Sequence, residues 1–135
     1  MIAIVCVDDN NGMMFNHRRQ SQDRMLREHV LQETNGAAVW MNAYSAKQFA
    51  DVEPSRLKVC EDFLEQAGNG DSCFVENQDL RPYLDRTREI ILYKWNRVYP
   101  ADFRFEVDLN SWKLEKTEEF AGSSHEKITR ERYIR

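Results

Sequence analysis

The chain has 135 residues, of which 41% are apolar and 31% charged, and its formal net charge at pH 7 is −4. This length and mixed composition predict one globular domain over residues 1–135 and argue against a disordered chain. An acidic chain gains no general attraction to phosphate polymers, so nucleic acid is not an expected partner. No apolar stretch approaches the roughly 18 residues of a membrane span, and the opening residues lack the basic segment of a signal peptide.

The three cysteines, Cys6, Cys60 and Cys73, lie in or beside apolar runs. Their odd number and wide spacing fit neither a disulfide framework nor a CxxC zinc pattern. We therefore expect small buried thiols, a cytoplasmic protein and no metal site.

Short apolar runs alternate with helical segments along the chain. Residues 2–7 form a β-branched run that ends in the turn sequence DDNNG, which predicts a buried strand. Residues 22–34 place apolar side chains on one helical face, with Ser21 as the expected N-cap and residues 35–36 as the C-cap. In chain order we then expect a strand at 37–41, a helix at 43–52, a strand at 56–60, a helix at 61–68, a strand at 72–76, a helical turn at 79–84, a strand at 89–95, and two antiparallel strands at 111–120 and 125–135.

Strands that are separated by single helices predict a parallel sheet with right-handed crossovers. The two strands at the end of the chain have no helix between them, so we expect them to pair antiparallel at one edge. The predicted fold class is therefore α/β, with a mostly parallel central sheet, an antiparallel C-terminal strand pair and helices on both faces.

The order of these segments resembles the dihydrofolate reductase family. IAIVCVDDNNGMM is similar to the family's opening ISLIAAVDxNxxIG, and AVWMNAYSAKQ is similar to PVIMGRKTYES. CFVENQDLRPYLDRTREIILYK corresponds to VFVIGGAELYxxALPxADRLYLT, and PADFRFEVDLNSWKLEKTEE to GDTxFPEIDLSEWELVSREE. The resemblance implies a shortened, divergent domain of this type. It has room for only one strand where the family has two, between the second helix and CFVE.

The resemblance also implies candidate site residues. The acid on the first helix that contacts the pterin in the family corresponds to Asp23 or Glu28, and the sequence leaves both open as the catalytic acid. The segments that meet NADPH correspond to Asn42, Ser45 and Asn77. Two further residues, Met13 and Lys94, are expected in the cleft, where Lys94 would pair with Asp23 or Glu28.

The cofactor side departs from the family pattern. The arginine that meets the 2′-phosphate of NADPH is replaced by Ala43, and the glycine pair is replaced by a segment that carries Glu76 and Asp79. Two carboxylates where an anion should bind would repel a phosphate group. We therefore expect no cofactor, with NADPH disfavoured, and a loss of NADPH-dependent dihydrofolate reduction.

Several functions remain open at this point. A derived member of the family would bind a small-molecule ligand or act through protein contacts, including a homodimer. The alternative is an active NAD(P)H-dependent reductase of a pterin or a related small molecule. A ribonuclease Z-type nuclease is least favoured, because its metal site needs an HxHxDH cluster and the three histidines are isolated.

Ser124 and His125 are adjacent, but we expect them in a polar hairpin loop, because a nucleophilic pair needs a third group brought in by the fold.

Overall fold

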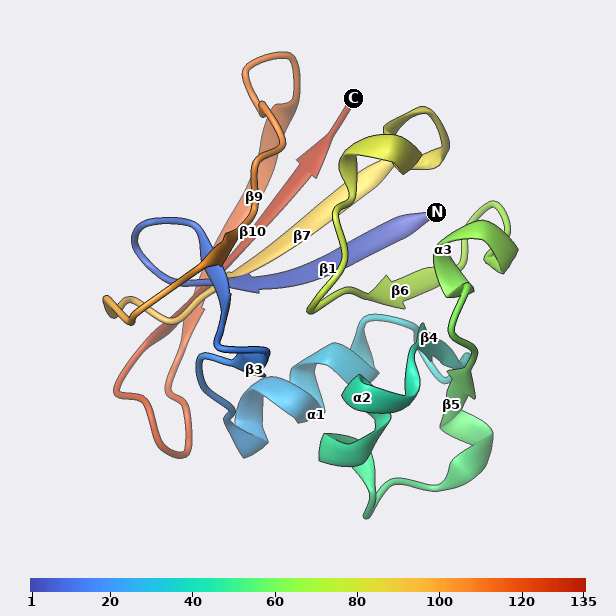
Figure 1. Cartoon of the computed structure of the whole chain (residues 1–135), viewed down its shortest axis with the longest axis horizontal. Helices are drawn as coiled ribbons and strands as arrows, with labels where there is room; N and C mark the ends of the chain where they lie inside the picture. The colour runs from blue at the N-terminus through green and yellow to red at the C-terminus, as the bar shows by residue number, and fades with distance from the viewer.

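The computed structural model describes residues 1–135, and its central feature is a seven-stranded sheet in the order β5-β4-β6-β1-β7-β10-β9 (Figure 1). The strands are β1 (Ile2–Val7), β4 (Val39–Met41), β5 (Leu57–Val59), β6 (Ser72–Phe74), β7 (Glu89–Lys94), β9 (Lys113–Phe120) and β10 (Ile128–Ile134). All of them fall within the ranges that the sequence predicts.

The pairing of the strands confirms the predicted fold class. β1 lies between β6 and β7 and runs parallel to both, so that Ala3 is opposite Cys73 on one side and Ile90 on the other. β10 is antiparallel to β7 and to β9, and the long β9–β10 hairpin forms one edge of the sheet (Figure 1). The parallel strands have apolar side chains on both faces because helices or loops cover each face.

The helices are shorter than predicted. They are α1 (Arg24–Gln32), α2 (Ala43–Ala46) and α3 (Phe63–Gln66), with 3₁₀ turns η1 (Lys47–Phe49), η2 (Pro54–Arg56) and η3 (Arg81–Arg86). The prediction of Ser21 as the N-cap of the first helix is wrong. The cap is Asp23, whose carboxylate accepts hydrogen bonds from the N–H groups of Met25 and Leu26. None of the helices is both long and apolar enough to cross a membrane.

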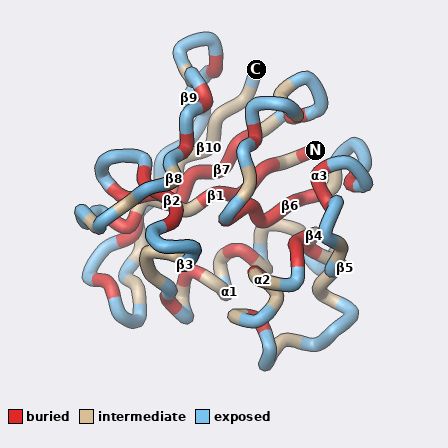
Figure 2. Tube along the Cα trace, viewed as in Figure 1, coloured by how far each residue is buried: buried red, intermediate tan, exposed pale blue.

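Buried residues form two clusters, which lie on the two faces of the sheet. Figure 2 shows buried segments along the central strands β1, β6 and β7. Successive residues of β1 point to opposite faces. Val5 therefore packs in the cluster that contains Phe63 of α3, while Ile4 packs in the cluster that contains Leu26 of α1 and Phe49 of η1. The expectation of buried thiols is confirmed only in part. Cys73 is buried, but Cys6 and Cys60 are half-buried.

A small second sheet, which the sequence analysis missed, covers the end of β1. It consists of β3 (Arg18–Arg19), β2 (Gly12–Phe15) and β8 (Phe103–Arg104), in that order. Gly12 allows the close approach that this packing needs, because a Cβ there would lie 2.7 Å from the Cβ of Ala101 and 3.0 Å from Oδ1 of Asp8. Two- to four-residue strands carry too little periodicity to be predicted from sequence.

Only one strand, β5, lies between η1 and β6, as the shortened middle of the sequence predicts. β5 pairs with β4 on one side and forms the edge of the sheet on the other. The sheet therefore ends at β5, the strand next to β4.

Candidate functional site

The carboxyl ends of β1, β4, β6 and β7 meet at one edge of the sheet because these four strands run parallel. In open α/β sheets this edge is where ligands bind. The residues that follow the strands here are Asp8 after β1, Asn42 after β4, Glu76 two residues after β6 and Trp95 after β7.

An ion pair occupies this edge. Nε of Arg19, on β3, lies 2.8 Å from one carboxylate oxygen of Glu76, and its Nη2 lies 3.1 Å from the other. The Arg19 guanidinium also stacks over the ring of Tyr44, 4.5 Å from the ring centroid, and its backbone N–H donates to the Tyr44 hydroxyl at 2.8 Å. The Glu76 side chain is only 8% exposed. This bidentate pair joins the small sheet to the central sheet.

The expectation that two carboxylates at this edge repel a phosphate needs correction. Glu76 is neutralised by Arg19, and Asp79 forms its own exposed pair with Arg81 at 2.9 Å. Free carboxylates therefore do not repel a phosphate at this edge. The obstacle is steric, because the paired side chains of Arg19 and Glu76 lie where the cleft would open.

The space that remains in the cleft is small. A cavity of about 10 Å³ remains there, which is enough for about one water molecule. Met13, an expected cleft residue, does lie here and is buried. The full lining is Cys6, Met13, Arg19, Gln20, Ser21, Val75, Glu76 and Trp95. The cleft is thus closed by the chain's own side chains.

The three candidate cofactor residues lie close to one another. The Asn42 side chain caps α2 by accepting the Ser45 N–H at 3.0 Å, and its amide donates to Asn77 at 2.8 Å. Ser45 is 1% exposed, and its hydroxyl has no hydrogen-bond partner. The N–H of Ala43, which begins α2, already donates to the carboxylate of Glu61 at 2.8 Å. This group of residues is polar, and a carboxylate of the chain occupies the place of an anion.

The two candidate acids have very different surroundings. Glu28 is exposed on α1, whereas Asp23 is 2% exposed. The Oδ2 of Asp23 accepts the N–H of Ser124 at 2.9 Å and lies 3.0 Å from Nδ1 of His125, and its Oδ1 accepts the N–H of Ser123 at 3.0 Å. Burial would raise the pKa of Asp23, but these hydrogen bonds outweigh it and hold the pKa well below its usual range. Asp23 is therefore an ionised carboxylate that fixes the β9–β10 loop to α1.

The predicted pairing of Lys94 with Asp23 or Glu28 is wrong. Lys94, the last residue of β7, forms an ion pair with Glu131 of the neighbouring strand β10 at 3.0 Å. Thr129 lies opposite Lys94 in this antiparallel pair, and Glu131 follows it two residues later on the same face. The Lys94 amine is therefore engaged along the sheet and does not reach the acids of the first helix.

His125 departs most from the sequence-based expectation. Residues 121–127 do form the loop of the β9–β10 hairpin, as predicted, but His125 in that loop is only 6% exposed. Its Nδ1 faces Asp23, and its Nε2 lies 2.9 Å from the hydroxyl of Ser21 and 3.1 Å from that of Tyr99. The ring stacks against Trp95 with centroids 4.6 Å apart. Because Ser21 and His125 are 104 positions apart, no local motif could have predicted this contact.

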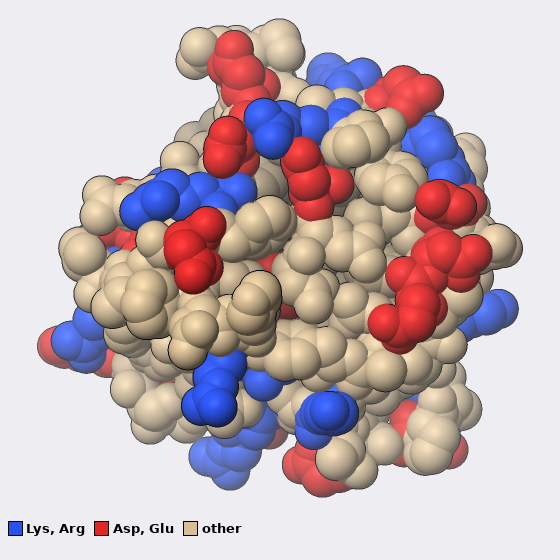
Figure 3. All heavy atoms as spheres, in the orientation of Figure 1, with Lys and Arg blue, Asp and Glu red and all other residues tan.

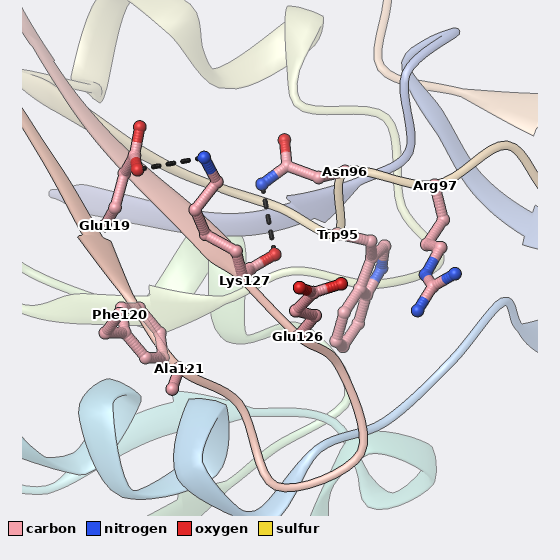
Figure 4. A pocket seen from close by; sticks show the side chains of 8 residues that line it. All are labelled: Trp95, Asn96, Arg97, Glu119, Phe120, Ala121, Glu126 and Lys127. Atoms are coloured by element: carbon pink, nitrogen blue, oxygen red, sulfur yellow. Dashed lines mark hydrogen bonds and ion pairs between the residues drawn. The ribbon is translucent and has the colours of Figure 1, made fainter.

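An open pocket lies outside the closed cleft, between the end of β7 and the β9–β10 hairpin (Figure 4). Its volume is about 660 Å³. Lys127 in its wall pairs with Glu119 at 3.1 Å and accepts a hydrogen bond from Asn96 on its backbone carbonyl at 3.1 Å. The lining residues are Trp95, Asn96, Arg97, Glu119, Phe120, Ala121, Glu126 and Lys127. No local sequence pattern points to this pocket, because its two walls come from segments far apart in the chain.

The surface has charges of both signs. On the face drawn in Figure 3, acidic and basic side chains are scattered among other residues, and a group of acidic side chains lies at the right. No group of three or more His, Cys, Asp or Glu side chains is arranged to hold a metal ion.

These features can be compared with known proteins. The chain has a dihydrofolate reductase-like fold. Among solved structures it is similar to dihydrofolate reductase from Enterococcus faecalis complexed with NADP(H) and RAB-propyl, with a TM-score of 0.70 over 99% of this chain and 95% of that one. The sequence identity is 11%, so the similarity shows the fold and leaves the activity open. No family model and no curated protein sequence matches the chain. The resemblance seen in the sequence is thus confirmed at the level of the fold.

Proposed function

We propose that this chain does not carry out NADPH-dependent reduction of dihydrofolate and that it binds a small ligand in the pocket beside Trp95. The observation that carries the first part is the Arg19–Glu76 ion pair, which fills the cleft at the carboxyl ends of the parallel strands. A reductase must hold a pterin and a nicotinamide side by side in such a cleft. A cavity of about 10 Å³ accommodates neither.

The cofactor side supports the same proposal. The position that reads a 2′-phosphate in the family is Ala43, which has no charge and no hydrogen-bonding side chain. Its backbone N–H, which would face a phosphate, donates to Glu61. NADPH would have to displace that carboxylate and separate the partly buried Arg19–Glu76 pair. Both steps cost free energy, so NADPH is disfavoured.

The pocket beside Trp95 suits a small ligand. Its volume of about 660 Å³ lies in the range of small-molecule sites. Trp95 and Phe120 supply aromatic surface. The charged lining residues are of both signs, two basic (Arg97, Lys127) and two acidic (Glu119, Glu126), and Lys127 is paired with Glu119. One wall is rigid, because Phe120 stacks on His29 of α1 with ring centroids 3.8 Å apart. This combination favours a ligand with a planar apolar part.

The experiment is a turnover assay combined with thermal unfolding. The chain is mixed with NADPH and dihydrofolate while NADPH absorbance is followed, and its Tm is measured with and without NADPH. We expect no turnover and no NADPH-dependent rise in Tm. Turnover, or a large stabilisation by NADPH, would contradict the proposal and support an NAD(P)H-dependent reductase of a pterin or a related molecule.

A second candidate function is contact with another protein at the β5 edge. The outer side of β5 has no strand paired to it, and Val59 on this strand is 51% exposed. Unpaired strand edges favour strand addition by another chain, including a second copy of this one. Measuring the mass in solution tests this directly. A dimer that a proline at Lys58 disrupts would support it, and a monomer at high concentration would exclude the homodimer.

We also propose a cytoplasmic location and a single domain over residues 1–135. The three unpaired thiols support a reducing compartment. Strands from both ends of the chain, β1 and β10, flank β7 in one sheet, which supports a single folding unit.

A further inference from the structure

Three side chains that are distant in sequence form a continuous hydrogen-bonded line beside the closed cleft. The Ser21 hydroxyl lies 2.9 Å from Nε2 of His125, and Nδ1 of His125 lies 3.0 Å from Oδ2 of Asp23. Asp23 and His125 are buried, whereas Ser21 is half-buried and reachable from solvent. We propose that Ser21, His125 and Asp23 form a nucleophile–base–carboxylate triad that hydrolyses small carboxylic esters.

Each member has the position that its role requires. Asp23 accepts the Nδ1–H of His125 and thereby leaves the Nε2 lone pair directed at Ser21, as a triad needs. The stacking of Trp95 on the imidazole, at 4.6 Å between centroids, holds the plane of the ring. The Asp23 carboxylate is kept ionised by backbone N–H groups, so it favours the positive charge that develops on His125 when Ser21 loses its proton.

The structural role of Asp23 does not account for the whole arrangement. Capping α1 and anchoring residues 123–125 use the Asp23 oxygens and backbone N–H groups. Neither role needs a hydroxyl on the far nitrogen of His125. The Ser21 contact is therefore an additional feature, and it places a half-buried hydroxyl beside the nitrogen that would take its proton.

The proposed reaction is acyl transfer to Ser21 followed by hydrolysis. Oγ of Ser21 forms a bond to the ester carbonyl carbon while its proton moves to Nε2 of His125. The bond to the leaving alkoxide breaks, and the alkoxide takes the proton from His125. Water then attacks the acyl-enzyme with His125 again as the base, which releases the carboxylic acid and restores Ser21. The backbone N–H groups of Ser21 and Gln22 have no partner within the chain and are available to the oxyanion.

The surroundings limit the substrate. On its inner side Ser21 borders the cavity of about 10 Å³, which holds no more than about one water molecule. The ester must therefore approach from the exposed side of Ser21. The Tyr99 hydroxyl, 3.1 Å from Nε2, competes with Ser21 for the same lone pair. The site thus favours small esters with a good leaving group, such as aryl acetates, and the reaction is slow while Tyr99 is present.

The test uses the full chain, a fluorophosphonate probe and p-nitrophenyl acetate. We expect one probe per chain, mapped to Ser21 by peptide mass, and ester hydrolysis that falls about 100-fold in Ser21→Ala. Ser55→Ala, a change at an exposed serine in η2, should leave both unchanged. Tyr99→Phe should raise the labelling rate, because it removes the competing hydroxyl.

Further variants separate a positioning role from a loss of folding. Asp23→Asn should lower kcat with little change in KM, provided that circular dichroism shows the parent fold. Ser21→Ala removes only one half-buried hydroxyl and should fold, so it decides the question if Asp23→Asn does not fold. No labelling of the folded chain, labelling at another residue, or equal hydrolysis by Ser21→Ala would overturn the proposal.

Discussion

Arg19 is the residue that keeps the cleft closed. Its guanidinium makes two hydrogen bonds to Glu76 and stacks on Tyr44, so a single side chain connects β3, α2 and the segment after β6. Removing it leaves the Glu76 carboxylate largely buried without a partner. The free energy of that uncompensated charge exceeds what the pair itself contributes.

Arg19→Ala should therefore lower the free energy of unfolding by about 3 kcal/mol. The double variant Arg19→Ala/Glu76→Gln should recover most of this loss, because a neutral amide is less costly to bury. Urea denaturation of the parent and both variants measures the effect. A single variant as stable as the parent would show that the pair does not hold the cleft closed.

Gly122 provides the space in which Asp23 meets the β9–β10 loop. A Cβ at this position would lie 2.5 Å from Oδ2 of Asp23 and 2.7 Å from the backbone oxygen of His125. We expect Gly122→Ala to destabilise the chain by about 2 kcal/mol. Gly68→Ala is the matched control, since its Cβ would meet only a flexible side-chain oxygen at 3.4 Å. Equal Tm values for the two variants would contradict this reading.

At the level of elements, the start of α1 depends on an ionised Asp23. Its pKa in the folded state is below the unfolded value of about 3.9. A lowered carboxyl pKa stabilises the folded state above the unfolded pKa, and this stabilisation is lost as the pH falls towards the folded pKa. We expect Tm to fall steeply below about pH 4, and less steeply in Asp23→Asn. Parallel profiles for parent and variant would show that another group controls the acid transition.

The end of α1 is held to the sheet by a second buried network. Glu33, the C-cap of α1, accepts two hydrogen bonds from Arg130 of β10, at 2.5 and 2.8 Å, and one from the Tyr93 hydroxyl of β7 at 2.8 Å. Arg130→Met should cost about 3 kcal/mol, because it leaves the largely buried Glu33 carboxylate without its cationic partner. Arg132→Met, on the same strand but with a more exposed pair, should cost less than about 1 kcal/mol. Chemical denaturation distinguishes the two.

At the level of the whole molecule, the strands were predictable and the closure of the cleft was not. The β-branched and apolar runs of β1, β6 and β7 indicate buried parallel strands, and their order indicates the fold. The Arg19–Glu76 pair joins positions 57 residues apart, and the Ser21–His125 contact joins positions 104 apart. Such contacts depend on the three-dimensional packing of loops, which leaves no periodic signal in one sequence.

The N-cap of α1 shows how a prediction from residue types differs from what the fold selects. Ser21 and Asp23 are both good capping residues, so sequence alone does not decide between them. The fold selects Asp23, because only an acceptor with two oxygens can cap the helix and also bind the N–H groups of residues 123–125. The same selection leaves Ser21 free to face His125.

The chain has a dihydrofolate reductase-like fold whose cleft is closed by its own side chains. Titration calorimetry of the chain with NADPH tests this closure, and Arg19→Ala/Glu76→Ala is the control in which the cleft is opened. We expect no saturable heat for the parent chain. Saturable binding of one NADPH per parent chain would contradict it.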